Sequence, residues 1–311
     1  MVERQLPKLD TRVRFPSAAP DLKVHMASIP PCVLTFAATD PSGGAGLQAD
    51  ILTLASIGCH PLSVVTGITV QDSVGVESIM PLDADWINDQ ARTILEDMQV
   101  TAFKLGLLGS VENVAVIAEI MADYPDVPLL IDPVLASGRG DELASEEMRA
   151  AMCELLFPQA TLITPNSIEA RRLAYYDDED EVKNTSLHQC AERLLEMGSE
   201  YVLITGTHER TNDVINSLYG RSGLIRDYHW ERLAGSYHGS GCTLTSAIAA
   251  CMAHGLSVEE AVQEAQEYTW QTLKNGFRPG MGQFIPDRFF WARDEDEQDD
   301  KGNGKSPSIQ H

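Results

Sequence analysis

The chain of 311 residues is predicted to form an α/β fold with a mostly parallel sheet and helices on both faces. Short apolar runs alternate with helix-period patterns along most of the sequence. A glycine-rich turn joins the first apolar run to the first helical pattern, as at the start of a βαβ unit. Two strand-like runs around Gly220 and Gly223 indicate one antiparallel hairpin. No internal repeat or linker divides the chain, so we expect one domain.

The elements can be predicted in chain order. The first strand is Cys32 to Ala38, and the turn 39–46 leads into a helix that begins near Leu47 and ends at Gly58. The remaining elements are strand 62–70, helix 83–98, strand 102–108, helix 110–122, strand 128–132, helix 143–156, strand 160–164, helix 167–176, an acidic loop 177–181, helix 185–197, strand 201–205, a hairpin within 213–233, a helix opened by 239–242 and a helix 258–273.

The two ends of the chain differ from the body in composition. Residues 1–30 show no apolar segment followed by a small-residue cleavage site, so we expect no signal peptide there. We expect these residues to form a flexible leader. Met26 shortly precedes the first strand, so the sequence leaves open whether residues 1–25 belong to the mature protein. From Asp294 to Asp300 only Gln298 is not acidic, and 294–311 is expected to form a disordered acidic tail. The folded domain is predicted to span 31–293.

Charge and cysteine usage restrict the partners and the compartment. The net charge of −23 argues against nucleic acid and anionic membranes, because both need clustered lysine and arginine. No apolar run approaches the ~20 residues of a membrane span. Six cysteines without CxxC spacing indicate reduced thiols and a cytoplasmic protein. A small phosphorylated ligand remains compatible, because it needs only local positive potential.

Polar residues follow the predicted strands where a parallel sheet binds its ligands, outside the carboxyl ends of the strands. Any one of them is more often a helix cap or turn former than a ligand contact. Together they predict a polar site along one edge of the sheet. They are Asp40, Gln71, Asp132, Asn166 and Thr205.

A second glycine-rich stretch, His238-Gly239-Ser240-Gly241-Cys242, runs directly into a helical pattern. The first N–H groups of a helix lack intrahelical partners and lie at the positive end of its dipole. With glycines at 239 and 241, these donors can approach a transferring phosphoryl group. The same field is expected to favour the thiolate of Cys242.

The late glycine motif has two other interpretations. A glycine turn with a buried cysteine would cap a core helix without any ligand. A hydrolase that pairs Cys242 with His238 is also open, but the sequence offers no third residue to orient the pair.

The first glycine turn supports a nicotinamide-dependent oxidoreductase as a rival function. Gly44-x-Gly46-x-x-Ala49 matches the dinucleotide fingerprint, and Asp72 lies roughly where the ribose-binding acid is expected. That reading does not explain the second glycine-opened helix. A P-loop kinase fits poorly, since GxxxxGK[ST] does not occur.

Phosphoryl transfer accounts for more of these features together. It needs donors aimed at the transferring group, a metal, and a pocket for the acceptor hydroxyl. The glycine-opened helix supplies the donors. Asn166-x-x-Glu169 places an amide and a carboxylate on one helical face, suited to Mg²⁺ held through water between phosphates. A capped helix is the alternative explanation of this pair.

Six segments in matching order resemble the hydroxymethylpyrimidine/phosphomethylpyrimidine kinases of thiamine biosynthesis. They lie within about 31–275 and read TDPSGGAGLQAD, TVQD, FKLGLLGS, IDPV, LITPNSIEA and HGSGCTLTSAIAA. The resemblance implies a three-layer α/β/α ribokinase-like fold and a homodimer. It also implies ATP- and Mg²⁺-dependent phosphorylation of 4-amino-5-hydroxymethyl-2-methylpyrimidine (HMP) to the monophosphate and then the diphosphate.

The resemblance also implies roles for individual residues. The catalytic anion hole would be Gly239, Ser240, Gly241 and Cys242. The pyrimidine would contact Gln71 and Asp50, with Gly43 and Gly44 lining its pocket. The nucleotide and metal would be bound by Asn166, Glu169, Asp132 and Thr205, with Mg²⁺ held indirectly by Glu169 and Asp132 through water and phosphates.

The sequence departs from the family pattern on the phosphate side. Residues 205–208 read TGTH where relatives often read KGGH, and 235–237 lacks a lysine that some relatives carry. Arg139 and Lys104 are the candidates to replace this charge. The alternatives are a pyridoxal or pyridoxine kinase, an NAD(P)-linked oxidoreductase, and a non-catalytic pyrimidine-binding relative.

Overall fold

The computed structural model describes residues 29–137, 140–176 and 185–292. Residues 1–28 of the predicted leader, the predicted tail 294–311, the acidic loop 177–181 and Arg139 lie outside the described residues. Pro31 begins the compact unit that contains every element below.

The centre of this unit is a sheet of eight strands within the described residues, in the order β10-β9-β8-β7-β6-β5-β1-β2. Their bounds are β1 Cys32–Ala37, β2 His60–Val65, β5 Val100–Leu105, β6 Leu129–Ile131, β7 Leu162–Ile163, β8 Tyr201–Ile204, β9 Val214–Gly220 and β10 Gly223–Trp230. Strands β1, β2 and β5 to β8 pair in parallel, whereas β9 and β10 form the predicted antiparallel hairpin. The predicted mostly parallel sheet is confirmed.

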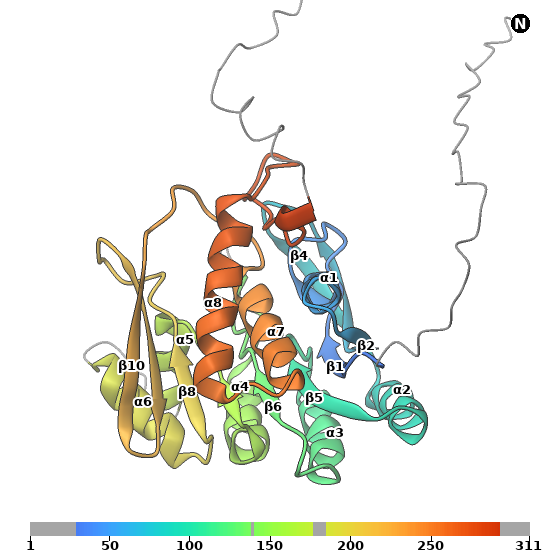
Figure 1. The fold of residues 1–311 in the computed structure, drawn as a ribbon. Coiled ribbons are helices and arrows are strands. Elements are labelled where there is room, and N and C mark those ends of the chain that lie inside the picture. The colour runs from blue at the N-terminus through green and yellow to red at the C-terminus, as the bar shows by residue number, and fades with distance from the viewer. Residues whose placement is uncertain (1–28, 138–139, 177–184, 293–311) are drawn as a thin grey trace, which may run out of the picture. The chain divides into compact units, whose positions relative to one another are not determined.

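Helices cover both faces of the sheet (Figure 1). On one face lie α2 Ala84–Asp97, α3 Val111–Ala122, α4 Glu146–Ala151, α5 Ser167–Ala174 and α6 Leu187–Glu196; on the other lie α1 Gly46–Ser56, α7 Ser240–Ala253 and α8 Val258–Lys274. Side chains of a strand alternate between faces, so Leu34 and Phe36 enter the first core and Val33 the second. The three-layer expectation is confirmed.

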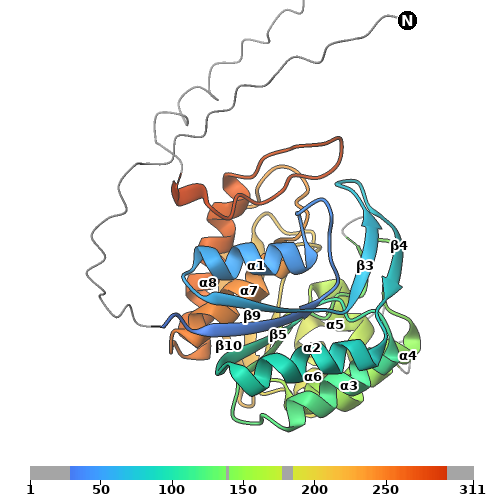
Figure 2. The same ribbon diagram turned by 90° about the vertical axis from the view of Figure 1, so that its right-hand side faces the viewer.

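Residues 62–70, predicted as one strand, are divided between two sheets. At Thr66 the main-chain N–H donates to the Ala37 carbonyl and the hydroxyl to the Leu107 carbonyl, at 3.1 and 2.6 Å. Beyond it, β3 (Gly67–Gln71) leaves the main sheet and pairs antiparallel with β4 (Val76–Pro81). Figure 2 shows this pair beside the main sheet. The sequence did not predict β4, because its half-exposed residues lack a clear apolar period.

Two other predicted boundaries were wrong. The predicted helix 143–156 starts later, because Leu143 N–H bonds to the Leu135 carbonyl and Ser145 caps α4. It continues as a π-turn over Met152–Leu156 and a 3₁₀ turn over Phe157–Gln159. The predicted strand 160–164 shortens to β7.

The segment after α8, for which the sequence predicted no structure, returns to the body of the molecule. Phe277 bridges to Ile285, and Phe284 bridges to Tyr237 in the loop before α7. A 3₁₀ turn, Phe290–Ala292, follows. Among the described helices, none combines the length and apolar character needed to cross a membrane.

Candidate active site

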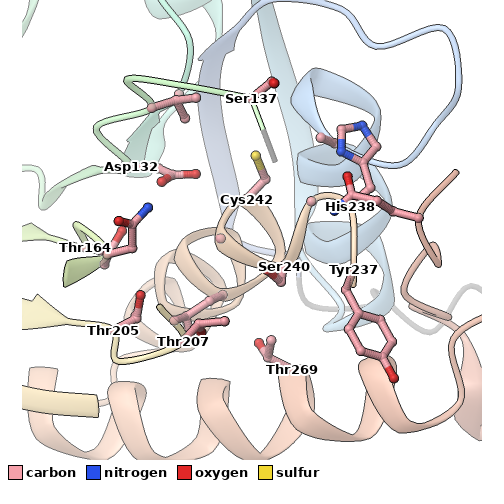
Figure 3. A pocket seen from close by; sticks show the side chains of 18 of the residues that line it. Asp132, Ser137, Thr164, Thr205, Thr207, Tyr237, His238, Ser240, Cys242 and Thr269 are labelled. Atoms are coloured by element: carbon pink, nitrogen blue, oxygen red, sulfur yellow. The ribbon is translucent and has the colours of Figure 1, made fainter. Parts of the chain in front are cut away.

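A cavity of about 520 Å³ lies at the carboxyl ends of the parallel strands. Most of the predicted site residues line it, namely Gln71, Asp132, Asn166, Glu169, Thr205, Gly239, Ser240, Gly241 and Cys242. The side chains come from the ends of β3, β6, β7 and β8 and from the start of α7. Figure 3 shows Cys242 between Asp132 and His238, with Thr205, Thr207 and Thr269 below the start of α7 in this view.

The two glycine-rich turns of the sequence meet beside this cavity. Gly239 has φ +80°, and a Cβ on it would overlap the Gly44 carbonyl. A Cβ on Gly44 would in turn overlap the imidazole of His238. Neither Gly43 nor Gly44 is among the residues that line the cavity, so their predicted role as pocket walls is not seen here. Gly44 supports the second turn instead.

Arg288 holds the Gly44 and Gly239 turns together, and the sequence analysis did not predict this role. Arg288 is 3% exposed, and its guanidinium donates to the Gly44 carbonyl at 2.6 Å and to Thr243 Oγ1 at 3.0 Å. Burial lowers the pKa of Arg288. It lies beyond the range of the family resemblance. An arginine within the aromatic run 284–291 was the available signal, since buried arginine usually has a structural or binding role.

The start of α7 presents main-chain donors to the cavity. Gly239 is the N-cap, in left-handed conformation, and no acidic residue occupies the first turn. The N–H groups of Ser240, Gly241 and Cys242 therefore have no intrahelical acceptor and carry the positive end of the dipole. This arrangement suits an anion, as the sequence predicted.

The thiol of Cys242 behaves differently from the prediction. Burial raises the pKa of Cys242, and the neighbouring carboxylate of Asp132 raises it further. Burial is the largest effect, and together with Asp132 it outweighs the charge of Lys104, which lowers the pKa of Cys242. The expected thiolate is wrong, and the group is a neutral thiol at neutral pH.

A buried ion pair supports this region from behind. Lys104 Nζ lies 2.8 and 2.9 Å from the two carboxylate oxygens of Asp50, and both side chains are fully buried. Asp50 also accepts from Thr35 and Ser246 at 2.7 and 2.8 Å. Burial alone would lower the pKa of Lys104, but Asp50 raises it well above its ordinary value.

This pairing changes two sequence expectations. Asp50 does not line the cavity, so the structure does not bring it to the place where a pyrimidine would contact it. Lys104 lines the cavity, but its charge is offset by Asp50 and is thus poorly suited to replace the missing lysines.

Asp132 and Glu169 form an acidic pair whose charges repel. Burial raises the pKa of Asp132, and its Oδ2 has no hydrogen-bond partner among the described residues. Burial, reinforced by Asp132, raises the pKa of Glu169 to about 8. A cation would relieve both effects, and carboxylate oxygens are what Mg²⁺ prefers. The described residues hold no cluster of three or more metal-ligating side chains.

Asn166 and Glu169 also form a capping box at the start of α5. Asn166 Oδ1 accepts from Ile168 and Glu169 N–H at 2.9 and 3.0 Å, and Glu169 Oε2 accepts from Asn166 N–H at 2.9 Å. The capped-helix interpretation of the NxxE motif is therefore confirmed. Both side chains also line the cavity, so capping fixes them there. Thr205 lies alongside, bridged to Asn166.

Gln71 reaches the cavity next to His238. The Gln71 amide nitrogen and Asp40 Oδ2 each lie 2.8 Å from His238 Nε2. His238 Nε2 can donate to Asp40 or accept from Gln71, but not both at once. Burial would raise the pKa of Asp40, but hydrogen bonds from His238, Ser42 and Ala45 lower it.

These contacts weaken two of the alternatives. His238 Nε2 faces Gln71 and Asp40, each at 2.8 Å, so this nitrogen is not directed at Cys242 as a base. The turn at Gly44 is filled by His238 and Arg288, where a dinucleotide pyrophosphate would need open backbone.

The chain is similar to known kinases in sequence and in structure. The family model described as phosphomethylpyrimidine kinase matches residues 40–287. A Streptomyces coelicolor protein named hydroxymethylpyrimidine/phosphomethylpyrimidine kinase is 38% identical over 257 residues, covering 81% of this chain and 92% of its own. A crystal structure of phosphomethylpyrimidine kinase from Clostridium difficile has a TM-score of 0.65 at 31% identity, covering 78% of this chain and 99% of its own. An ADP complex of Bacillus subtilis pyridoxal kinase has a TM-score of 0.75 at 29% identity, covering 85% of this chain and 99% of its own.

Proposed function

The chain belongs to the phosphomethylpyrimidine kinase family, and from that premise we propose that it uses ATP to phosphorylate HMP. The monophosphate is then phosphorylated again, giving the diphosphate needed for thiamine biosynthesis. One observation supports this most directly. A single cavity joins the Gln71 amide, the N-terminus of α7 and the Asp132–Glu169 acid pair, so acceptor, transferring phosphoryl group and metal-bound nucleotide have places in one space.

Binding of the acceptor is assigned to Gln71. Its amide both donates and accepts, which matches a ring nitrogen beside an exocyclic amine. When a pyrimidine takes this amide, His238 Nε2 is left to donate to Asp40. Asp50 acts indirectly, by holding Lys104 beneath the cavity. Gly44 acts by holding the second turn, through Arg288 and Gly239.

Transfer is assigned to the start of α7. The N–H groups of residues 240–242 are held in place before the reaction and stabilise the charge on the transferring group. The transition state of phosphoryl transfer needs little nucleophile activation, so a neutral Cys242 thiol is compatible with turnover. Asp132 and Glu169 would hold Mg²⁺, with Asn166 and Thr205 beside the nucleotide; the ion would neutralise phosphate charge.

Pyridoxal kinase is a second candidate, because the pyridoxal kinase of Bacillus subtilis aligns with a higher TM-score than the Clostridium difficile phosphomethylpyrimidine kinase, 0.75 against 0.65. Both substrates are aromatic rings with a hydroxymethyl group. The fold alone does not separate them, since function is set by the site.

The test is a product assay on the purified full chain. The protein is incubated with Mg-ATP and with HMP, HMP phosphate, pyridoxal or ribose, and phosphorylated products are followed by mass spectrometry. We expect both pyrimidines to be phosphorylated with the highest kcat/KM. Preferential phosphorylation of pyridoxal would establish the second candidate, and no transfer to any acceptor would support a non-catalytic relative.

Assembly, location and domain limits complete the proposal. We propose a homodimer in the cytoplasm, with a kinase domain of 31–293, as the resemblance and the cysteine usage indicate. Light scattering after gel filtration measures the oligomeric state. A monomeric mass at assay concentration would contradict the dimer without affecting the proposed reaction.

A further inference from the structure

The cavity is poor in positive charge for a site that would take a nucleotide polyphosphate. Among its described lining residues, the lysine and arginine side chains are Lys104 and Arg232. The carboxylates that line it are Asp40, Asp132, Glu169 and Glu231. Lys104 is offset by Asp50, at 2.8 and 2.9 Å from its two oxygens. Among the described lining residues, the local positive potential therefore depends on how Arg232 is paired.

Arg232 is held by uncharged acceptors. Its Nε donates to the Thr211 carbonyl at 3.2 Å, Nη1 to the Thr207 carbonyl at 2.8 Å and Nη2 to the Glu209 carbonyl at 3.0 Å. The Glu209 carboxylate is engaged elsewhere, with Arg171 at 2.8 and 3.3 Å. Carbonyl groups orient a guanidinium without cancelling its charge.

The same contacts leave donor capacity. A guanidinium has five N–H groups, and the three carbonyls take one each. Two N–H groups remain, which is the number that a bidentate contact with a phosphate requires. An arginine fixed at its other donors also loses little side-chain freedom on binding.

Arg232 is placed where the sequence lacks lysine. It lies between β10 and α7, just before the segment 235–237, and it holds the loop 207–211 that follows β8. Thr207, from that loop, lines the same cavity as Thr205 and the start of α7, and Figure 3 shows it below Ser240 in this view. One guanidinium thus stands between the two segments that depart from the family pattern.

Resting on the proposed kinase function, we propose that Arg232 binds the polyphosphate of the nucleotide. It takes over the charge of the absent lysines, through the two N–H groups that the 207–211 loop does not use. The ligand chemistry is a nucleoside triphosphate or diphosphate, recognised by a fork of donors rather than by a point charge.

The test is calorimetric titration of ATP and of adenosine into the full chain and its Arg232→Gln and Arg232→Lys variants. Arg226→Gln is the matched control, because Arg226 lies exposed on β10 over Tyr228 and does not line the cavity. We expect Arg232→Gln to weaken ATP binding ~10- to 100-fold, the range of a charge-assisted hydrogen bond, with adenosine unchanged. Arg232→Lys should recover part of the loss, and Arg226→Gln should match the wild type.

Three outcomes are separable. An equal loss of ATP and adenosine affinity would show that Arg232 only positions the loop, and would overturn the inference. Unchanged ATP affinity in Arg232→Gln, in a protein that phosphorylates HMP, would overturn it as well while leaving the proposed function standing. A wild-type protein that binds no ATP and phosphorylates no acceptor would overturn the proposed function itself. Melting temperatures of all variants identify any that fail to fold.

Discussion

Gly239 packs against the carbonyl group of Gly44 so closely that no side chain fits between them. The contact joins the turn after β1 to the turn that opens α7. Arg288 lies across it, bonded to the Gly44 carbonyl and to Thr243 of α7. The position of the α7 donors therefore depends on a contact that only glycine permits.

Gly239→Ala tests this contact. The new Cβ would meet the Gly44 carbonyl, and φ +80° is strained for alanine. We expect kcat to fall about 100-fold, the effect of displacing a catalytic group by ~1 Å. The strain alone costs about 1–2 kcal/mol of unfolding free energy, and the collision adds to that.

Gly43→Ala is the matched control, measured by steady-state kinetics and urea denaturation. Gly43 has a similar φ of +74°, but a Cβ there meets nothing within 4 Å. We expect the strain to lower the free energy of unfolding of Gly43→Ala, while the variant keeps most of its kcat. Equal kcat values for the two variants would show that the contact does not position α7.

The raised pKa of Cys242 makes its reactivity a second test. Because only the thiolate is alkylated, iodoacetamide should modify Cys242 more slowly at pH 7.5 than it modifies glutathione in the same tube. The rate should keep rising as pH increases to 9. Peptide mapping by mass spectrometry assigns the modified residue, with Cys242→Ala as the control. Rapid modification that levels off by pH 7 would restore the thiolate interpretation.

Glu169, with a pKa of about 8 against an ordinary 4.5, makes stability depend on pH. Between these values the folded state binds more protons than the unfolded state, so the free energy of unfolding falls as pH rises. We expect metal-free wild type to lose stability between pH 5 and 8. In the Glu169→Gln variant, the part of this loss that comes from deprotonation of Glu169 should be absent, as measured by urea denaturation in EDTA.

Glu209→Gln provides a control of opposite sign. A hydrogen bond from Arg171 lowers the pKa of Glu209, so its contribution is present above its ordinary pKa and lost only under acidic conditions. The slope of stability between pH 5 and 8 should therefore match wild type in Glu209→Gln. Identical slopes in Glu169→Gln and wild type would mean that Glu169 is ionised in the metal-free protein.

Gln71→Ala separates acceptor binding from nucleotide binding. Removing a buried polar contact of about 1–3 kcal/mol should raise KM for HMP by ~10- to 100-fold while KM for ATP stays unchanged. Gln90→Ala is the matched control, since Gln90 contacts the backbone of Val65 outside the cavity. If KM rose for ATP and not for HMP, Gln71 would be assigned to nucleotide binding instead.

The sequence by itself determined the features that depend on neighbours along the chain. Alternating apolar runs predicted the parallel sheet, and the residues that follow its strands, such as Asp132 and Asn166, line the cavity as expected. Glycines before a helical pattern predicted the open start of α7. These signals are local because hydrogen bonding in a helix and alternation in a strand repeat within a few residues.

Only the tertiary structure decided where charges and partners lie. The family resemblance predicted Asp50 as a substrate contact, yet Asp50 of α1 pairs with Lys104 of β5 and does not line the cavity. Cys242 stands at a helix N-terminus, yet burial beside Asp132 reverses the expected shift of its pKa. Arg288 comes from the far end of the chain to lock two turns. Coulomb energy and desolvation depend on distances through space and on solvent access, which a linear pattern does not contain.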